Sequence, residues 1–195
     1  TIIPRGRALG VTMFLPEQDR YSHSKQRLES QLCSLYGGRV AEELIFGAEK
    51  VTTGASNDIQ RATAIARDMA TKWGLSDELG PMTYGEQEDE VFLGRSVTQH
   101  KNVSDETARK IDEVVRRTLD AAYVEATRIL TENMDKLHMM ADTLLTYETI
   151  DEPQIDAIMR GERPGPPSDW QNAAPVPGNE PPPAAGSVGG PATQS

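Results

Sequence analysis

The chain has 195 residues, of which 37% are hydrophobic, and a formal net charge of −10. No segment gathers lysine and arginine densely, which argues against a protein that follows nucleic-acid phosphates or binds an acidic membrane surface. No apolar run approaches the ~20 residues of a membrane span, and the single cysteine, Cys33, excludes an internal disulfide.

The first predicted element is a strand over residues 8–15. Hydrophobic side chains alternate there at Leu9, Val11, Met13 and Leu15, which places them on one face of an extended segment. Pro16 ends the pattern. We therefore expect a small, half-buried β element near the start of the chain.

A long helix is predicted over residues 22–46. Its seam contains Leu28, Leu32 and Leu35 and continues to Arg39 and Glu42, which are spaced to form an ion pair. A structural ion pair is the favoured interpretation, and Glu42 as an outer-shell partner of a metal ligand is the alternative. The Gly37-Gly38 pair interrupts the helix, which indicates close approach by another element.

The next helix begins within VTTGASNDIQRATAIARDMATKW at 51–73, with Ser56 as the predicted N-cap. Helical spacing from Asp58 reaches Ala62, Ile65 and Met69, so Asp58 heads an apolar stripe. A buried carboxylate there needs a cation, a metal or several hydrogen bonds. Two interpretations remain open: a first-turn acid that complements the helix dipole, or a metal ligand or catalytic group.

Further helices are predicted from Ser104, from about Asp135, and from Pro153, the first two forming an antiparallel pair joined near Asn133. Residues 164–195 hold nine of the thirteen prolines and few large apolar side chains, a composition typical of disordered segments. The sequence thus predicts a mainly α domain with a small β element over residues 1–161 and a disordered Pro/Gly-rich tail over residues 162–195.

Few catalytic arrangements are compatible with this sequence. It has no GxxxxGK[ST] phosphate loop and no GxSxG elbow. The three histidines are far apart and form no HxxxH pair, whereas catalytic zinc takes three protein ligands and an open water position. This chain alone is not expected to hold catalytic zinc.

Several segments match one family in order. LYGGRVAEELIFG at 35–47 and VTTGASNDIQRATAIARDM at 51–69 resemble the protease domain of the FtsH family, which are membrane-anchored AAA proteases that use zinc. The resemblance includes residues 5–25, 90–97, 104–112 and 147–151, and covers roughly residues 1–160.

The resemblance implies a zinc site built from a His-Glu-x-x-His helix and a later aspartate, which corresponds to Asp58. The histidines and the catalytic glutamate would lie upstream of Thr1, so no catalytic residue is expected in this chain. The family's substrate-side edge strand would correspond to residues 8–15, with Gly10, Val11, Thr12 and Met13 as candidate substrate contacts.

For the parent protein, the resemblance implies an ATP-dependent zinc metalloendopeptidase that degrades membrane and soluble proteins. It would be a homo-hexamer on the cytoplasmic side of a bacterial inner membrane, anchored by segments absent here. ATP would bind the AAA module and not this chain, which alone should be inactive. The alternative is a non-catalytic helical scaffold derived from the protease fold, with Asp58 as a helix-start residue.

Overall fold

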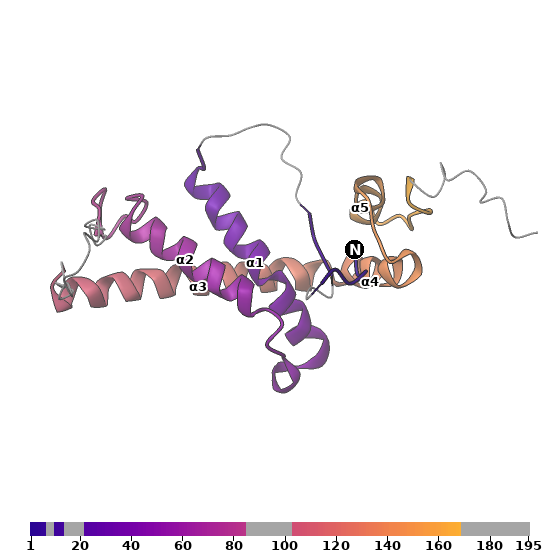
Figure 1. The fold of residues 1–195 in the computed structure, drawn as a ribbon, viewed down its shortest axis with the longest axis horizontal. Coiled ribbons are helices and arrows are strands. Elements are labelled where there is room, and N and C mark those ends of the chain that lie inside the picture. Colours follow the sequence, from indigo (N-terminus) through magenta and orange to yellow (C-terminus); the bar gives the residue numbers. More distant parts are fainter. Residues whose placement is uncertain (7–9, 14–21, 85–102, 169–195) are drawn as a thin grey trace, which may run out of the picture. The chain divides into compact units, whose positions relative to one another are not determined.

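The computed structural model describes residues 1–6, 10–13, 22–84 and 103–168, and these are mainly helical, as predicted (Figure 1). The helices are α1 (Lys25–Phe46), α2 (Ser56–Thr71), α3 (Asp105–Glu132), α4 (Met134–Tyr147) and α5 (Glu152–Met159), with a short 3-10 turn, η1 (Ala48–Lys50). The chain divides into two compact units. One, the three-helix unit, is Met13–His138; the other, the terminal unit, is Thr1–Thr12 with Met139–Ser195.

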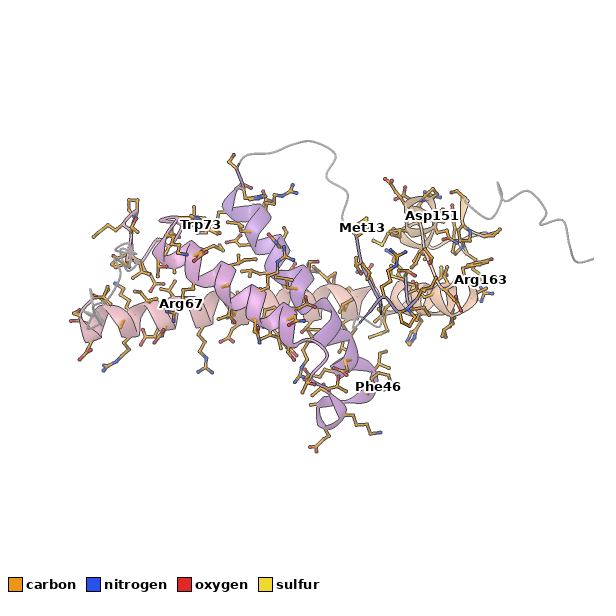
Figure 2. All side chains as sticks on the ribbon, viewed as in Figure 1. Met13, Phe46, Arg67, Trp73, Asp151 and Arg163 are labelled. Atoms are coloured by element: carbon orange, nitrogen blue, oxygen red, sulfur yellow. The ribbon has the colours of Figure 1, made fainter. Side chains whose placement is uncertain are left out.

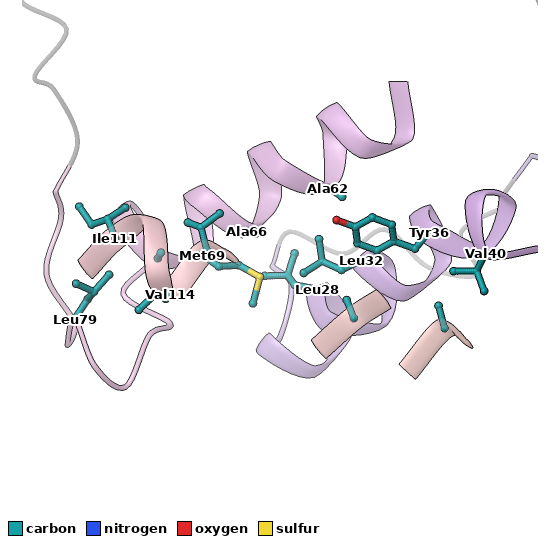
Figure 3. Close-up of a cluster of buried hydrophobic side chains, with 14 residues drawn as sticks. Leu28, Leu32, Tyr36, Val40, Ala62, Ala66, Met69, Leu79, Ile111 and Val114 are labelled. Atoms are coloured by element: carbon teal, nitrogen blue, oxygen red, sulfur yellow. The ribbon is translucent and has the colours of Figure 1, made fainter. Parts of the chain in front are cut away.

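The core of the three-helix unit lies where α1, α2 and α3 pack against one another (Figure 3). The buried stripe of α1 consists of residues spaced by four. The residues of α2 that pack against it are mostly small, which allows the two helices to approach closely. The buried residues of α1 and α2 in this cluster are Leu28, Leu32, Tyr36, Val40, Ala62, Ala66, Met69 and Ala70. The predicted α1 seam is correct at Leu28 and Leu32. Beyond them it follows Tyr36 and Val40, so that Arg39 and Glu42 stay half-exposed.

Two of the helix starts follow the rules for capping. Ser24 Oγ accepts a hydrogen bond from the Arg27 N–H at 3.3 Å, and Ser104 Oγ accepts one from the Thr107 N–H at 3.1 Å. The prediction for α2 was wrong by one residue, since Ala55 is the N-cap and Ser56 is already helical. The Ser56 hydroxyl is not free to cap because it donates to the Thr53 carbonyl.

The Gly37-Gly38 pair does not mark a close approach within the described parts of the chain. A Cβ built on either glycine meets no atom within 4 Å. A tight position in the three-helix unit is instead Gly74, where φ is +61° and an added Cβ would lie 2.8 Å from Pro81 Cα. The glycine pair therefore leaves an open surface on α1.

The predicted antiparallel pairing of the two C-terminal long helices is also wrong. Asn133 is the single residue between α3 and α4, and its carbonyl already accepts the first hydrogen bond of α4, from Leu137 N–H at 3.0 Å. The face of α3 that carries Ile111, Val114 and Val115 packs against α1 and α2. On α4, Ala141 is exposed and Leu145 is 76% exposed, whereas Thr143 is buried.

In the terminal unit, a capping box opens α5. Asp151 Oδ1 accepts from the Gln154 N–H and Gln154 Oε1 accepts from the Asp151 N–H, both at 3.1 Å. The described start of the Pro-rich segment is attached to the same turn. Gln154 Nε2 donates to the Gly165 carbonyl at 2.7 Å, and Asp151 Oδ2 accepts from the Ser168 N–H and hydroxyl at 2.8 and 2.7 Å. Residues 162–168 are thus bound to α5, and the rest of the predicted tail lies outside the described residues.

Asp151→Ala is expected to loosen α5 together with residues 164–168. Loss of an aspartate N-cap costs about 1 kcal/mol, and the two hydrogen bonds from Ser168 are lost as well. Backbone amide exchange in α5 at neutral pH should become several-fold faster. Asp156→Ala is the matched control, since Asp156 lies on the same helix and does not cap it. Equal exchange rates in the two variants would contradict the prediction.

The same contact predicts a pH dependence. Hydrogen bonds from the Ser168 hydroxyl and backbone hold the pKa of Asp151 below its ordinary value, which is about 3.9. A lowered folded-state pKa gives stability that is present above the unfolded-state pKa and is lost as the pH falls through the folded-state pKa. The difference in exchange between wild type and Asp151→Ala should therefore shrink below about pH 4. A difference that stays constant into acid would contradict this assignment.

Candidate metal and substrate site

Asp58 lies in the first turn of α2, and its carboxylate is exposed. The expectation that it is turned away from water is wrong. Ala62 and Met69 on the predicted stripe are buried and Ile65 is partly buried, but the covering by α1 and α3 does not reach the first turn. Within the described residues, Asp58 has no hydrogen bond or ion pair from its side chain. A first-turn carboxylate that neither caps its helix nor pairs with a cation is free to bind a ligand from outside.

The donor chemistry of Asp58 suits one position of a zinc site, because carboxylate oxygen is a normal zinc ligand. The rest of such a site is not present in the described parts of the chain, where no three His, Cys, Asp or Glu side chains are grouped to hold a metal. His23 and His138 are both exposed on other segments, and His100 lies outside the described residues. Asp58 thus fits zinc as a single ligand that needs partners from elsewhere.

The loop before α2 is attached to α1 through Thr52. Arg39 Nη1 donates to the Thr52 carbonyl at 3.4 Å. Hydrogen bonds from the Thr52 backbone and hydroxyl are the main reason that the pKa of Glu42 lies below its ordinary value, and Arg39 adds to this effect. No ion pair joins these two side chains in the structure, which corrects the predicted Arg39–Glu42 pair. Arg39 thus connects α1 to the loop that leads into Asp58, and Glu42 lies beside the same threonine.

A second contact extends this cluster to α3. The Tyr123 hydroxyl donates to the Glu43 carboxylate, and the Tyr123 ring packs edge-on against Tyr36 with centroids 5.3 Å apart. Burial, followed by the bond to Glu43, raises the pKa of Tyr123. The part of α1 that holds the 51–55 loop is therefore itself bound to the core.

The candidate substrate residues Gly10, Val11, Thr12 and Met13 are all exposed. They form no regular strand, and the other residues of the predicted strand lie outside the described residues. Val11 exchanges two main-chain hydrogen bonds with Thr1, with N···O distances of 2.9 and 3.0 Å. Gly10 permits this approach, since a Cβ there would lie 2.9 Å from the Thr1 oxygen. In a trans peptide the carbonyl and the following N–H point in opposite directions, so the Gly10 carbonyl and the Thr12 N–H are directed away from Thr1.

Comparison with known proteins decides the family. Residues 1–158 match the family model described as Peptidase family M41. The chain belongs to Peptidase family M41.

Three relatives of this M41 chain have the same name. The chain is 63% identical over 159 residues to the ATP-dependent zinc metalloprotease FtsH of Photobacterium profundum. This alignment covers 82% of the chain and 23% of that relative. The FtsH of Haemophilus influenzae is 58% identical over 170 residues, covering 87% and 27% respectively. That of Caulobacter vibrioides is 54% identical over 161 residues, covering 83% and 26%. The predicted resemblance is confirmed, and the chain spans about a quarter of the length of these relatives.

Sequence reasoning missed Thr52 and the Glu43–Tyr123 contact in this M41 chain. Thr52 is in the TTGASN-like segment that carries the resemblance, which was the one available signal for it. Tyr123 is eighty residues from Glu43 along the chain, and no pattern in the sequence joins the two.

Among the described residues, no helix is both long and apolar enough to cross a membrane.

Glu42→Gln is expected to loosen the loop before Asp58 while the core stays intact. The amide keeps an acceptor oxygen but loses the charge that strengthens the bonds from Thr52. Hydrogen exchange at Thr52, Thr53 and Gly54 should become faster, with unchanged exchange in the buried middle of α2. Glu49→Gln in the adjacent η1 is the control for removing one exposed acid. If hydrogen exchange in this loop were the same in both variants, Glu42 would have no role in positioning it.

Proposed function

We propose that this chain is a part of an ATP-dependent zinc metalloendopeptidase in which Asp58 is the carboxylate ligand of zinc. The observation that carries the proposal is the exposed carboxylate at the start of α2, which has no ion-pair partner among the described residues, in a chain that belongs to Peptidase family M41. The name of its relatives, zinc metalloprotease, supports the choice of metal. The remaining ligands, two histidines, and the general-base glutamate would come from outside this chain.

Each of this chain's residues would have a positional task at that site. Zinc, when bound, supplies a Lewis acid and an activated water for peptide hydrolysis. Asp58 would offer one oxygen ligand from a helix whose Ala62, Ala66 and Met69 are buried in the core, which limits its movement. Glu42, through Thr52, would steady the preceding loop as an outer-shell residue rather than touch the metal.

Substrates are proposed to be polypeptides bound in an extended form along Gly10, Val11, Thr12 and Met13. The Gly10 carbonyl and the Thr12 N–H, directed away from Thr1, are the candidate hydrogen-bonding partners. Main-chain hydrogen bonds form with an extended peptide and depend little on its side chains, which suits a protease of broad sequence tolerance. Membrane and soluble proteins are both proposed as substrates.

The proposal for the whole protein extends beyond this chain. ATP would bind a separate AAA module, the assembly would be a homo-hexamer, and other segments would anchor it on the cytoplasmic side of a bacterial inner membrane. Nucleic acid is not proposed as a partner, in keeping with the net charge of −10.

The coding region immediately upstream of Thr1 tests this proposal directly. An in-frame His-Glu-x-x-His is expected there, and the complete protein should bind zinc in proportion to its folded active sites. An open frame without this motif would overturn the proposal and favour the non-catalytic helical scaffold, in which Asp58 only complements the α2 dipole.

A further inference from the structure

A cavity of about 410 Å³ lies in the three-helix unit, away from Asp58. It is bounded by the first half of α1, the end of α2, residues 75–78 and the middle of α3. The wall is mainly apolar, with Leu75, Met69 and Val114, and small alanines on α2 and α3 leave the space open. Its volume is within the range of cavities that take small organic ligands.

The rim of this cavity is acidic. It contains the carboxylates of Glu29, Asp77, Glu78 and Glu125 against the cations of Lys25 and Arg117. Both cations are already paired, Lys25 with Asp77 at 3.4 Å and Arg117 with Glu78 through both guanidinium nitrogens. Glu125 is paired with Arg128 outside the cavity lining. Glu29, exposed on α1, has no ion-pair partner in the described parts of the chain.

The hydroxyl groups of the lining are used within the protein. Thr118 Oγ1 donates to the Val114 carbonyl at 2.9 Å, and Ser76 Oγ accepts from the Leu79 N–H at 3.3 Å. The carboxylates are therefore the strongest polar groups that the lining offers to a ligand. The negative charge of the lining also acts on the Cys33 thiol. Burial raises the pKa of this thiol, and the nearby Glu125 and Glu29 carboxylates raise it further.

We propose that this cavity binds small hydrophobic cations, with the apolar body against Leu75 and Val114 and the ammonium or guanidinium group beside Glu29. An anion of the same shape would be repelled by the carboxylates of the rim. A neutral molecule would gain only the apolar contacts. The site lies on residues that the proposed zinc chemistry does not use.

Phenethylammonium is a suitable probe, with phenethyl alcohol and hydrocinnamate as neutral and anionic relatives. Titration calorimetry on the whole 195-residue chain should show the cation binding most tightly, and its affinity should fall as salt is added. Because Cys33 lines the cavity and is the only cysteine, saturation with the cation should slow alkylation by iodoacetamide. Equal affinity for the alcohol, or no binding of the cation, would overturn the proposal.

Substitutions at Glu29 and Ala121 locate the binding. Glu29→Gln should raise the dissociation constant of phenethylammonium by about two- to fivefold, the usual value of one exposed charge contact, while Glu113→Gln on the exposed side of α3 should leave it unchanged. Ala121→Phe should obstruct the cavity and weaken both binding and Cys33 protection. If Ala121→Phe loses helicity, Glu29→Lys replaces it, with loss of cation binding as the expected result. Binding unaffected by the folded variants would show that the cation binds elsewhere.

Discussion

Asp58→Asn in the complete protein is expected to abolish proteolysis and leave ATP hydrolysis largely intact. Asparagine keeps the size of the side chain but removes the negative charge that a zinc ligand supplies. Loss of an outer-shell partner already costs about 10–100-fold in metal affinity or activity, so loss of a direct ligand should cost at least as much. Zinc content, degradation of an unfolded protein substrate and ATP turnover, measured on one preparation, check the result.

The structure makes this substitution a clean test. Asp58 is exposed and forms no hydrogen bond or ion pair within the described residues, so its replacement should leave the fold and thermal midpoint unchanged. Asp68→Asn on the same helix is the matched control: it removes only an i, i+4 surface pair with Lys72 at 3.0 Å, which is worth at most about 1 kcal/mol. Full proteolysis by Asp58→Asn at ordinary zinc levels would end the assignment of Asp58 as a ligand.

Leu32→Ala should be the most damaging change to stability among those considered. Leu32 has 0% exposure and lies in the cluster shared by α1, α2 and α3 (Figure 3). Truncating a buried leucine costs about 2–5 kcal/mol, depending on how far the site can collapse. Urea unfolding followed by helical circular dichroism should show a lower midpoint for the three-helix unit.

Leu145→Ala provides the control for Leu32→Ala. Leu145 is the same residue type on a helix, but 76% exposed, so its truncation should change the free energy of unfolding by no more than about 0.5 kcal/mol. If Leu32→Ala were equally mild, the three helices would not share the core described here.

Exposed apolar side chains at the end of α1 show how differently one helix can be covered along its length. Leu44, Ile45 and Phe46 are 37, 42 and 61% exposed, and Phe46 marks that end in Figure 2. Leu28 and Leu32, earlier on the same helix, are buried. Hydrophobicity alone therefore does not predict which leucine substitution is costly.

Local patterns in the sequence were sufficient to place the helices, because capping and amphipathic spacing act within a few residues. Ser24 and Ser104 open α1 and α3 as side-chain caps, although Ser24 begins the first helix slightly later than the apolar pattern indicated. The family followed from long motifs, and the same motifs singled out Asp58. These features depend on residues close together in the chain.

Contacts between distant segments decided the remaining features. Whether Asp58 is exposed depends on how far α1 and α3 cover α2, and the binding of Thr52 depends on where Arg39 and Glu42 meet it. The cavity beside Leu32 is lined by residues of α1, α2 and α3 together, which no single segment specifies. A periodic pattern specifies which face of a helix is apolar, but the packing partner of that face is set by the three-dimensional arrangement, in which burial and charge pairing are satisfied together.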